Sequence, residues 1–245
     1  IGRSGKQPQR AESILNRVQA ACDAGDKMIK PDVVFFNALI NAYGWSTERG
    51  KSAKCYEILN VMLDLHASKK NVDAKPDIVT CNSVLNACAF EQAGSETEHA
   101  AIMDIVVNTL ETFQSSSPKY GYPDHVTYAQ VLLAVANHMQ MNEKREKLAE
   151  ATFWQCCKSG HVSVMVVSNL KVALPWDRFA DLMGPALKSS KGTKLRFDAG
   201  KLPSSWVRYT RSALRRKSFS RPSRKRAPSN VTKQSLSKAK NGDAA

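Results

Sequence analysis

Three stretches of the chain resemble one another, and this internal repeat constrains the fold more than any other feature. The stretch KPDVVFFNALINAYG returns as KPDIVTCNSVLNACA and as YPDHVTYAQVLLAVA, with its prolines at Pro31, Pro76 and Pro123. Separations of 45 and 47 residues lie in the range that is typical of stacked repeats. In such arrays each unit packs on the next, because no unit buries its apolar face alone.

Each copy carries the apolar pattern of one helical face. Apolar residues stand five, eight, nine and twelve positions after each proline, which is the i, i+3, i+4, i+7 spacing of a helix. Pro followed by Asp suits a helix entry, because Pro fixes φ and Asp accepts hydrogen bonds from free N–H groups. A second helix is predicted after each copy, over residues 51–66, 96–113 and 143–158. The predicted unit is helix, turn, helix, and the predicted fold class is all-α.

We divide the chain into four parts. Residues 11–24 have the pattern of a helix that would be the second half of an incomplete repeat, and because the chain begins with Ile1 we interpret it as a fragment that lacks its N-terminus. Two further helices are predicted past Gly160, the second with Trp176, Phe179, Leu182 and Met183 on its apolar face. The expected parts are a frayed N-terminus with one helix (1–30), the repeats (31–75, 76–122 and 123–160), degenerate terminal helices and a cap (161–207), and a disordered Lys/Arg/Ser-rich tail (208–245).

The positive charge of the chain is concentrated at its C-terminal end. The formal net charge is +14, but residues 208–245 hold 12 Lys or Arg against one acidic residue, a net charge of +11. Residues 1–207 therefore carry only +3. This asymmetry predicts an anionic partner for the tail, whereas recognition by the body must rest on particular side chains.

The spacing of reactive side chains predicts neither catalysis nor a bound cofactor. The sequence contains no assembled set of paired carboxylates, Ser-His-Asp residues or phosphate-loop glycines, so we expect that the protein is not an enzyme. The tightest group of metal-binding types is Cys156, Cys157 and His161, and no second ligand pair follows at zinc spacing. No run of about eighteen apolar residues predicts a transmembrane helix. Four other histidines share no spacing and are expected at the surface: His66, His99, His125 and His138.

The repeated motif resembles the pentatricopeptide repeat family. The resemblance rests on Pro-Asp-Val/Ile-Val, on the Asn six residues after the proline, on the following Leu-Ile or Val-Leu pair, and on the spacing from Cys55 to Met62 in the second helix. It covers residues 11–174 approximately. The resemblance implies a right-handed α-solenoid that binds single-stranded RNA in a mitochondrion or chloroplast, with about one base read per repeat.

The resemblance also implies which side chains would read RNA. In the family, one residue of the first helix and the last residue of the same repeat select the base together; here these are Asn37 with Asp77, and Asn82 with Asp124. The Asn/Asp combination implies a preference for uracil, hence U-rich RNA. An Asn amide offers a donor and an acceptor, and a neighbouring carboxylate can fix its direction. The positions that sandwich the bases in the family are occupied by Val34, Val79 and Val126.

Other interpretations of these residues remain open. In the third copy Ala129 stands where the reading Asn would be, so no base is assigned there. Asn37 and Asn82 could instead have a structural role, and an array of this kind could be a scaffold that binds proteins. Asn41 and Asn86 also recur, and we expect them to bond between helices.

The C-terminal part of the chain allows two predictions. The Leu202-Pro203-Ser204-Ser205-Trp206 segment resembles an ending found in some algal members of the family, but we favour a cap in which Trp206 covers the end of the stack. The tail is expected to bind RNA phosphates without reading sequence, with a nuclear localisation signal as the alternative. The basic residues expected to bind phosphate are Arg215, Arg216, Lys217, Arg221, Arg224, Lys225 and Arg226.

Overall fold

The fold of the described part of the chain is all-α, with one two-residue strand pair near its C-terminal end. The computed structural model describes residues 30–115, 119–188 and 196–210, and six single positions before residue 21. The expected helix over 11–24 and the basic tail therefore lie, wholly or for the most part, outside the described residues. No helix in the described ranges is long and apolar enough to cross a membrane.

Each repeat motif begins a first helix, and a second helix follows it. These first helices are α2 (Val33–Gly44), α4 (Ile78–Ala89) and α6 (His125–His138), and α8 (Val164–Ala173) is a fourth first helix that lacks the motif. The second helices are α3 (Lys51–Ala67), α5 (Glu96–Ser115) and α7 (Glu143–Ser159). The three second helices lie within two residues of the bounds predicted from the apolar spacing. A short helix α9 (Trp176–Met183) ends the series, and 3-10 turns cover Val72–Ala74, Gly184–Ala186 and Ala199–Lys201.

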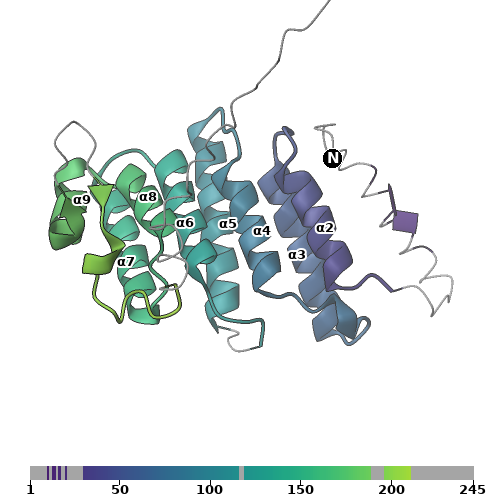
Figure 1. Cartoon of the computed structure of the whole chain (residues 1–245). Helices are drawn as coiled ribbons and strands as arrows, with labels where there is room; N and C mark the ends of the chain where they lie inside the picture. Colours follow the sequence, from purple (N-terminus) through teal and green to yellow (C-terminus); the bar gives the residue numbers. More distant parts are fainter. Residues whose placement is uncertain are drawn as a thin grey trace, which may run out of the picture.

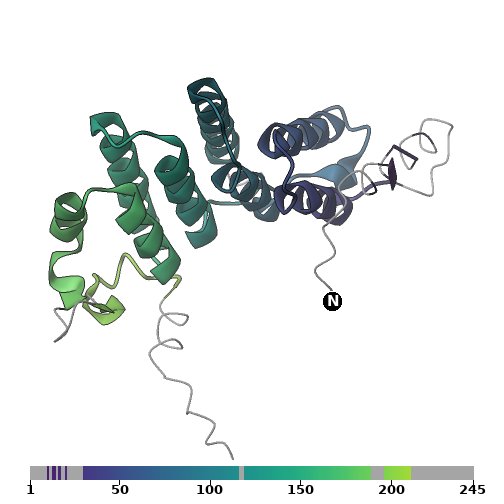
Figure 2. The same ribbon diagram turned by 90° about the horizontal axis from the view of Figure 1, so that it is seen from above.

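The helices are arranged in two rows, which Figures 1 and 2 show from two sides. Each first helix contacts the next, in the order α2, α4, α6, α8, and each of the first three also packs on the second helix of its own repeat. The first helices begin at their N-cap residues Asp32, Asp77, Asp124 and Ser163, whose side chains accept hydrogen bonds from backbone N–H groups of the first turn. The N-terminal turns of successive first helices therefore lie beside one another.

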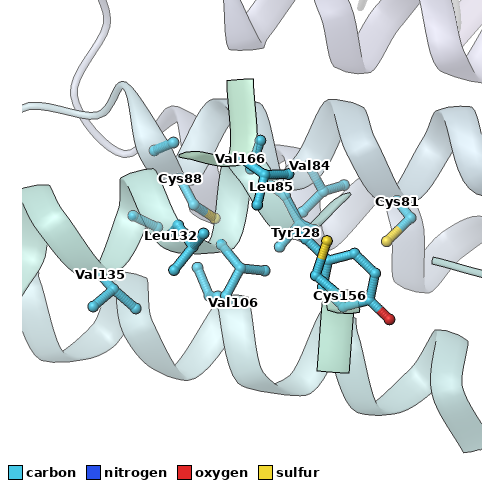
Figure 3. Packing of buried hydrophobic residues seen from close by; sticks show 14 of the residues in the cluster. Cys81, Val84, Leu85, Cys88, Val106, Tyr128, Leu132, Val135, Cys156 and Val166 are labelled. Atoms are coloured by element: carbon cyan, nitrogen blue, oxygen red, sulfur yellow. The ribbon is translucent and has the colours of Figure 1, made fainter. Parts of the chain in front are cut away.

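The core runs continuously through both rows, as expected when each unit buries its apolar face against the next. The helical-face residues predicted from the repeat are all buried. Gly44 of α2 lies against Ala87 of α4, and a Cβ on Gly44 would make an ordinary contact of 3.6 Å with the Cβ of Ala87. Figure 3 shows buried side chains of α4 and α6 packed together with Val106 of α5, Cys156 of α7 and Val166 of α8. The buried helical-face residues are Phe36, Leu39, Ile40, Tyr43, Cys81, Val84, Leu85, Cys88, Tyr128, Val131, Leu132 and Val135.

The segment from Leu202 to Thr210 packs on the turn between α7 and α8. The ring of Trp206 lies edge-on to Phe153 and Trp154 of α7, with ring centroids 5.7 Å and 5.5 Å apart. Its backbone oxygen accepts from the N–H of Val162 at 2.9 Å. Gly160 has a positive φ of 77°, and a Cβ there would lie 3.0 Å from the backbone oxygen of Ser205. Trp206 is thus an anchor, as predicted, but it holds the segment to the α7–α8 turn.

Two details of the C-terminal region differ from the sequence predictions. Trp176 was expected on the buried face of its helix, yet 43% of its surface is exposed. It is the first residue of α9, whose Phe179 and Met183 are buried and whose Leu182 packs half-buried against the core. The irregular stretch before residue 200 contains the strand pair, β1 (Leu187–Lys188) and β2 (Arg196–Phe197), which are antiparallel with Leu187 opposite Phe197.

Candidate functional site

The first candidate site lies where α2 meets the N-terminus of α4. The side-chain Nδ2 of Asn37 donates to Oδ1 of Asp77 at 3.2 Å. The Oδ1 of Asn37 accepts from the hydroxyl of Thr80 at 2.7 Å. Asp77 also accepts from the backbone N–H of Thr80 at 2.9 Å and so caps α4. The amide of Asn37 is therefore held at both ends by residues of the next repeat.

The second candidate site repeats this arrangement between α4 and α6. Nδ2 of Asn82 donates to Oδ1 of Asp124 at 3.2 Å, and the hydroxyl of Thr127 donates to Oδ1 of Asn82 at 2.7 Å. Asp124 caps α6 by accepting from the backbone N–H of Thr127 at 3.0 Å. The pairs that the sequence predicted, Asn37 with Asp77 and Asn82 with Asp124, are thus in direct contact.

Among the described residues, these contacts leave each amide with one unused donor and one unused acceptor lone pair. An Asn side chain has two N–H donors and an oxygen with two lone pairs, and the network uses one of each. The direction of the amide follows from the carboxylate, since a carboxylate oxygen can only accept and the nitrogen end must face it. The remaining N–H and lone pair form a fixed pattern that a partner with the complementary pattern can bind.

Valine side chains lie beside the two networks. Val34 and Val79 occupy the second position of α2 and α4, and 70% and 50% of their surfaces are exposed. Val126, at the same position of α6, is half-buried. Apolar surface of this size on the first turn of successive helices is available to pack against flat apolar faces of a ligand.

The third interface, between α6 and α8, has no such network. Ala129 is fully buried, Ser163 caps α8 through the N–H of Val166, and Val166 is also fully buried. The side-chain amide of Asn169 on α8 donates to the backbone oxygen of Ala129 at 2.7 Å. Within the described residues, the polar sites therefore stop after the second interface.

The chain was compared with family models, curated proteins and solved structures. No family model, curated protein or solved structure matches the chain. The two networks, the exposed valines and the repeated sequence motif are therefore the basis for a proposed function.

The threonines that complete both networks were not predicted from the sequence. Thr80 and Thr127 stand three residues after the capping Asp, the position whose side chain can bond back to the N-cap backbone in a capping box. That signal was present in the sequence, but it predicts a helix start and not a contact with the preceding repeat. Asn86 does bond between helices, as expected, since its Oδ1 accepts from Nε2 of Gln130 at 3.0 Å.

Two histidines expected at the surface form a partly buried pair. His138 is buried; its Nε2 lies 2.8 Å from the backbone oxygen of Cys88, and its Nδ1 lies 2.9 Å from Nδ1 of His99. Because a carbonyl oxygen only accepts, Nε2 of His138 is the protonated nitrogen, and His99 donates between the rings. Burial lowers the pKa of His138. The separation of 39 residues in the sequence does not predict this contact, which depends on how α5 packs on α6.

The cysteines of the described chain are structural. Burial raises the pKa of Cys55 and Cys157 to about 12 and also raises the pKa of Cys81, Cys88 and Cys156. A thiol with so high a pKa supplies little thiolate at neutral pH and is a poor nucleophile. No three metal-binding side chains cluster among the described residues. The predicted phosphate-binding residues, from Arg215 to Arg226, lie outside those residues.

Proposed function

We propose that the protein is a pentatricopeptide repeat protein, a right-handed α-solenoid that binds single-stranded RNA. Two repeats would each read one uracil, through Asn37 with Asp77 and through Asn82 with Asp124. The observation that carries the proposal is the same three-residue network, with the same bond lengths, at two successive interfaces beside exposed valines. No catalytic step is part of this function.

The third interface argues against a purely structural role for the networks. α6 and α8 pack on each other with Ala129 and Val166 fully buried at the equivalent positions. First helices can therefore stack without a buried amide. Since burying polar groups costs free energy unless every bond is made, networks that leave one donor and one acceptor unused are better explained by a ligand.

Uracil has the complementary chemistry. Its Watson–Crick edge carries an N–H donor flanked by two carbonyl acceptors, so the free acceptor and donor of Asn37 or Asn82 can each find a partner. The exposed side chains of Val34 and Val79 would pack against the flat faces of neighbouring bases. Single-stranded RNA presents unpaired base edges and faces in this way, whereas a duplex hides them.

The basic tail fits the same proposal. Its net charge of +11 would bind phosphates by releasing counterions, adding affinity that does not depend on sequence. We place the protein in a mitochondrion or chloroplast, where the family acts on RNA processing, stability or translation. Nuclear import directed by the tail is the alternative.

A protein-binding scaffold is the second candidate function. A cleft of about 660 Å³ lies between α5, the end of α6 and the first turns of α7. Met103 and Val107 line one wall and Leu148 the other, so a peptide with apolar side chains could bind there. In that case the tail alone would contact nucleic acid.

The two functions are separated by measuring affinity for U-rich and A-rich oligonucleotides at physiological salt. The measurement uses the full chain and a chain that ends after Thr210, the last described residue. RNA reading predicts a preference for the U-rich strand that persists without the tail. Equal binding to both strands that disappears with the tail would favour the scaffold.

A further inference from the structure

The hydroxyls of Thr80 and Thr127 have a single proton each, and the network decides where it goes. The hydroxyl of Thr80 accepts from the backbone N–H of Asp77 at 3.1 Å. Its proton can then reach Oδ1 of Asn37 at 2.7 Å or Oδ1 of Asp77 at 3.0 Å. The aspartate oxygen already accepts two N–H bonds, so the shorter contact to Asn37 receives the proton. At Thr127 the oxygen of Asp124 accepts three N–H bonds, so the proton again goes to the shorter contact, Oδ1 of Asn82 at 2.7 Å.

We propose that Thr80 and Thr127 are positioning residues for base selection, which rests on the RNA-reading function proposed above. Both threonines are fully buried, so they do not touch RNA themselves. Each supplies the bond to the oxygen end of the reading amide, whereas the aspartate supplies the bond to its nitrogen end. With both bonds present, the amide plane has one orientation.

Orientation matters because uracil and cytosine differ only in their pattern of donors and acceptors. Uracil offers a ring N–H donor beside carbonyl acceptors, whereas cytosine offers a ring nitrogen acceptor beside an amino donor. A reading amide that is bonded only to its aspartate can rotate about that contact. It can then pair with the donors and acceptors of uracil or with those of cytosine. The threonine hydroxyl therefore contributes selectivity for uracil over cytosine.

Capping of the helix alone does not account for these threonines. Thr80 and Thr127 complete capping boxes in α4 and α6, but α2 forms with Phe35 at the same position and only Asp32 as its cap. At α8 the equivalent residue is Val166. A first helix therefore forms without a threonine at this position, and among the described residues the two threonines stand where a reading Asn of the preceding repeat contacts them.

The test compares two double variants of the full chain. Thr80→Val with Thr127→Val keeps the branched shape and removes the hydroxyl, whereas Thr80→Ser with Thr127→Ser keeps the hydroxyl. Affinities for U-rich and C-rich oligonucleotides are measured at physiological salt, with thermal unfolding in parallel. We expect the valine variant to lose about fivefold in its U-over-C preference per site, as for one hydrogen bond lost at each, and the serine variant to keep the preference.

A control variant and the single variants make the outcome decisive. Ser163→Ala removes the cap of α8, where no reading Asn is present, and should lower stability without changing base preference. If the double valine variant does not fold, each single valine variant is tested, with a smaller loss expected. A valine variant with the preference of the original chain overturns this inference alone. An original chain without any U preference overturns the proposed function, and this inference falls with it.

Discussion

The inter-repeat role of Asp77 can be measured without RNA, by comparison with Asp32. Both residues cap a first helix, but Asp77 also accepts from the side chain of Asn37 in the preceding repeat. Replacing an N-cap Asp by Ala costs about 1 kcal/mol, and a side-chain hydrogen bond contributes about another 1 kcal/mol. Asp77→Ala also leaves the amide of Asn37, only 9% exposed, with an unpaired N–H.

We therefore expect Asp32→Ala to lower the free energy of unfolding by about 1 kcal/mol and Asp77→Ala by about 2–3 kcal/mol. The assay is equilibrium unfolding in urea, followed by circular dichroism and by tryptophan fluorescence. Coincident transitions and an unchanged m-value would show that the shift in midpoint reports stability. Asp77→Asn is the matched control, because Asn caps a helix as well as Asp does, and it should cost less than the alanine.

An equal loss of unfolding free energy in the two alanine variants would contradict this prediction. It would mean that Asp77 acts only as a helix cap and that its contact with Asn37 adds no stability between repeats. The carboxylate would then not hold the nitrogen end of the Asn37 amide, and the orientation of that amide would not be fixed.

Three other predictions follow from the charges and pKa shifts. Removing residues 211–245 should flatten the dependence of RNA affinity on salt; an unchanged slope would reject a phosphate-binding tail. In a Cys22→Ser chain, the folded protein should take up no iodoacetamide at pH 8, whereas the denatured protein should take up five, because burial keeps the described thiols protonated. The lowered pKa of His138 means that the fold favours its neutral form, so this stability is present above the ordinary pKa of 6.5 and is lost as the pH falls through the lower folded value. The thermal midpoint should fall more from pH 7 to pH 5 in the original chain than in His138→Gln, and parallel curves would contradict this.

The sequence predicted the helices well because the governing signal is local. Apolar spacing within each copy and the Pro-Asp start determine which face is buried and where the helix begins, and neither depends on distant residues. The second helices ended within two residues of their predicted bounds for the same reason. The prediction that Trp176 is buried was wrong, because an apolar pattern does not show how much of a short terminal helix is covered by other elements.

The candidate site was predicted only in part. The Asn and Asp of each pair were predicted from the family resemblance. Thr80 and Thr127 were not, because a threonine at this position predicts a helix cap and not a second bond to the preceding repeat. The His99–His138 pair depends on the angle between α5 and α6, which no local pattern encodes. Contacts between side chains some 40 residues apart need the packed structure.

Whether Asn37 and Asn82 read bases can be tested by comparing the RNA affinities of two double variants. The double variant Asn37→Ala, Asn82→Ala is compared with Asn86→Ala, Asn137→Ala, whose amides bond between helices. Base readout predicts that the first variant loses about 1–3 kcal/mol per site for U-rich RNA and little for A-rich RNA, while the second keeps the preference. If both variants bind U-rich RNA with the affinity of the original chain, Asn37 and Asn82 do not read bases.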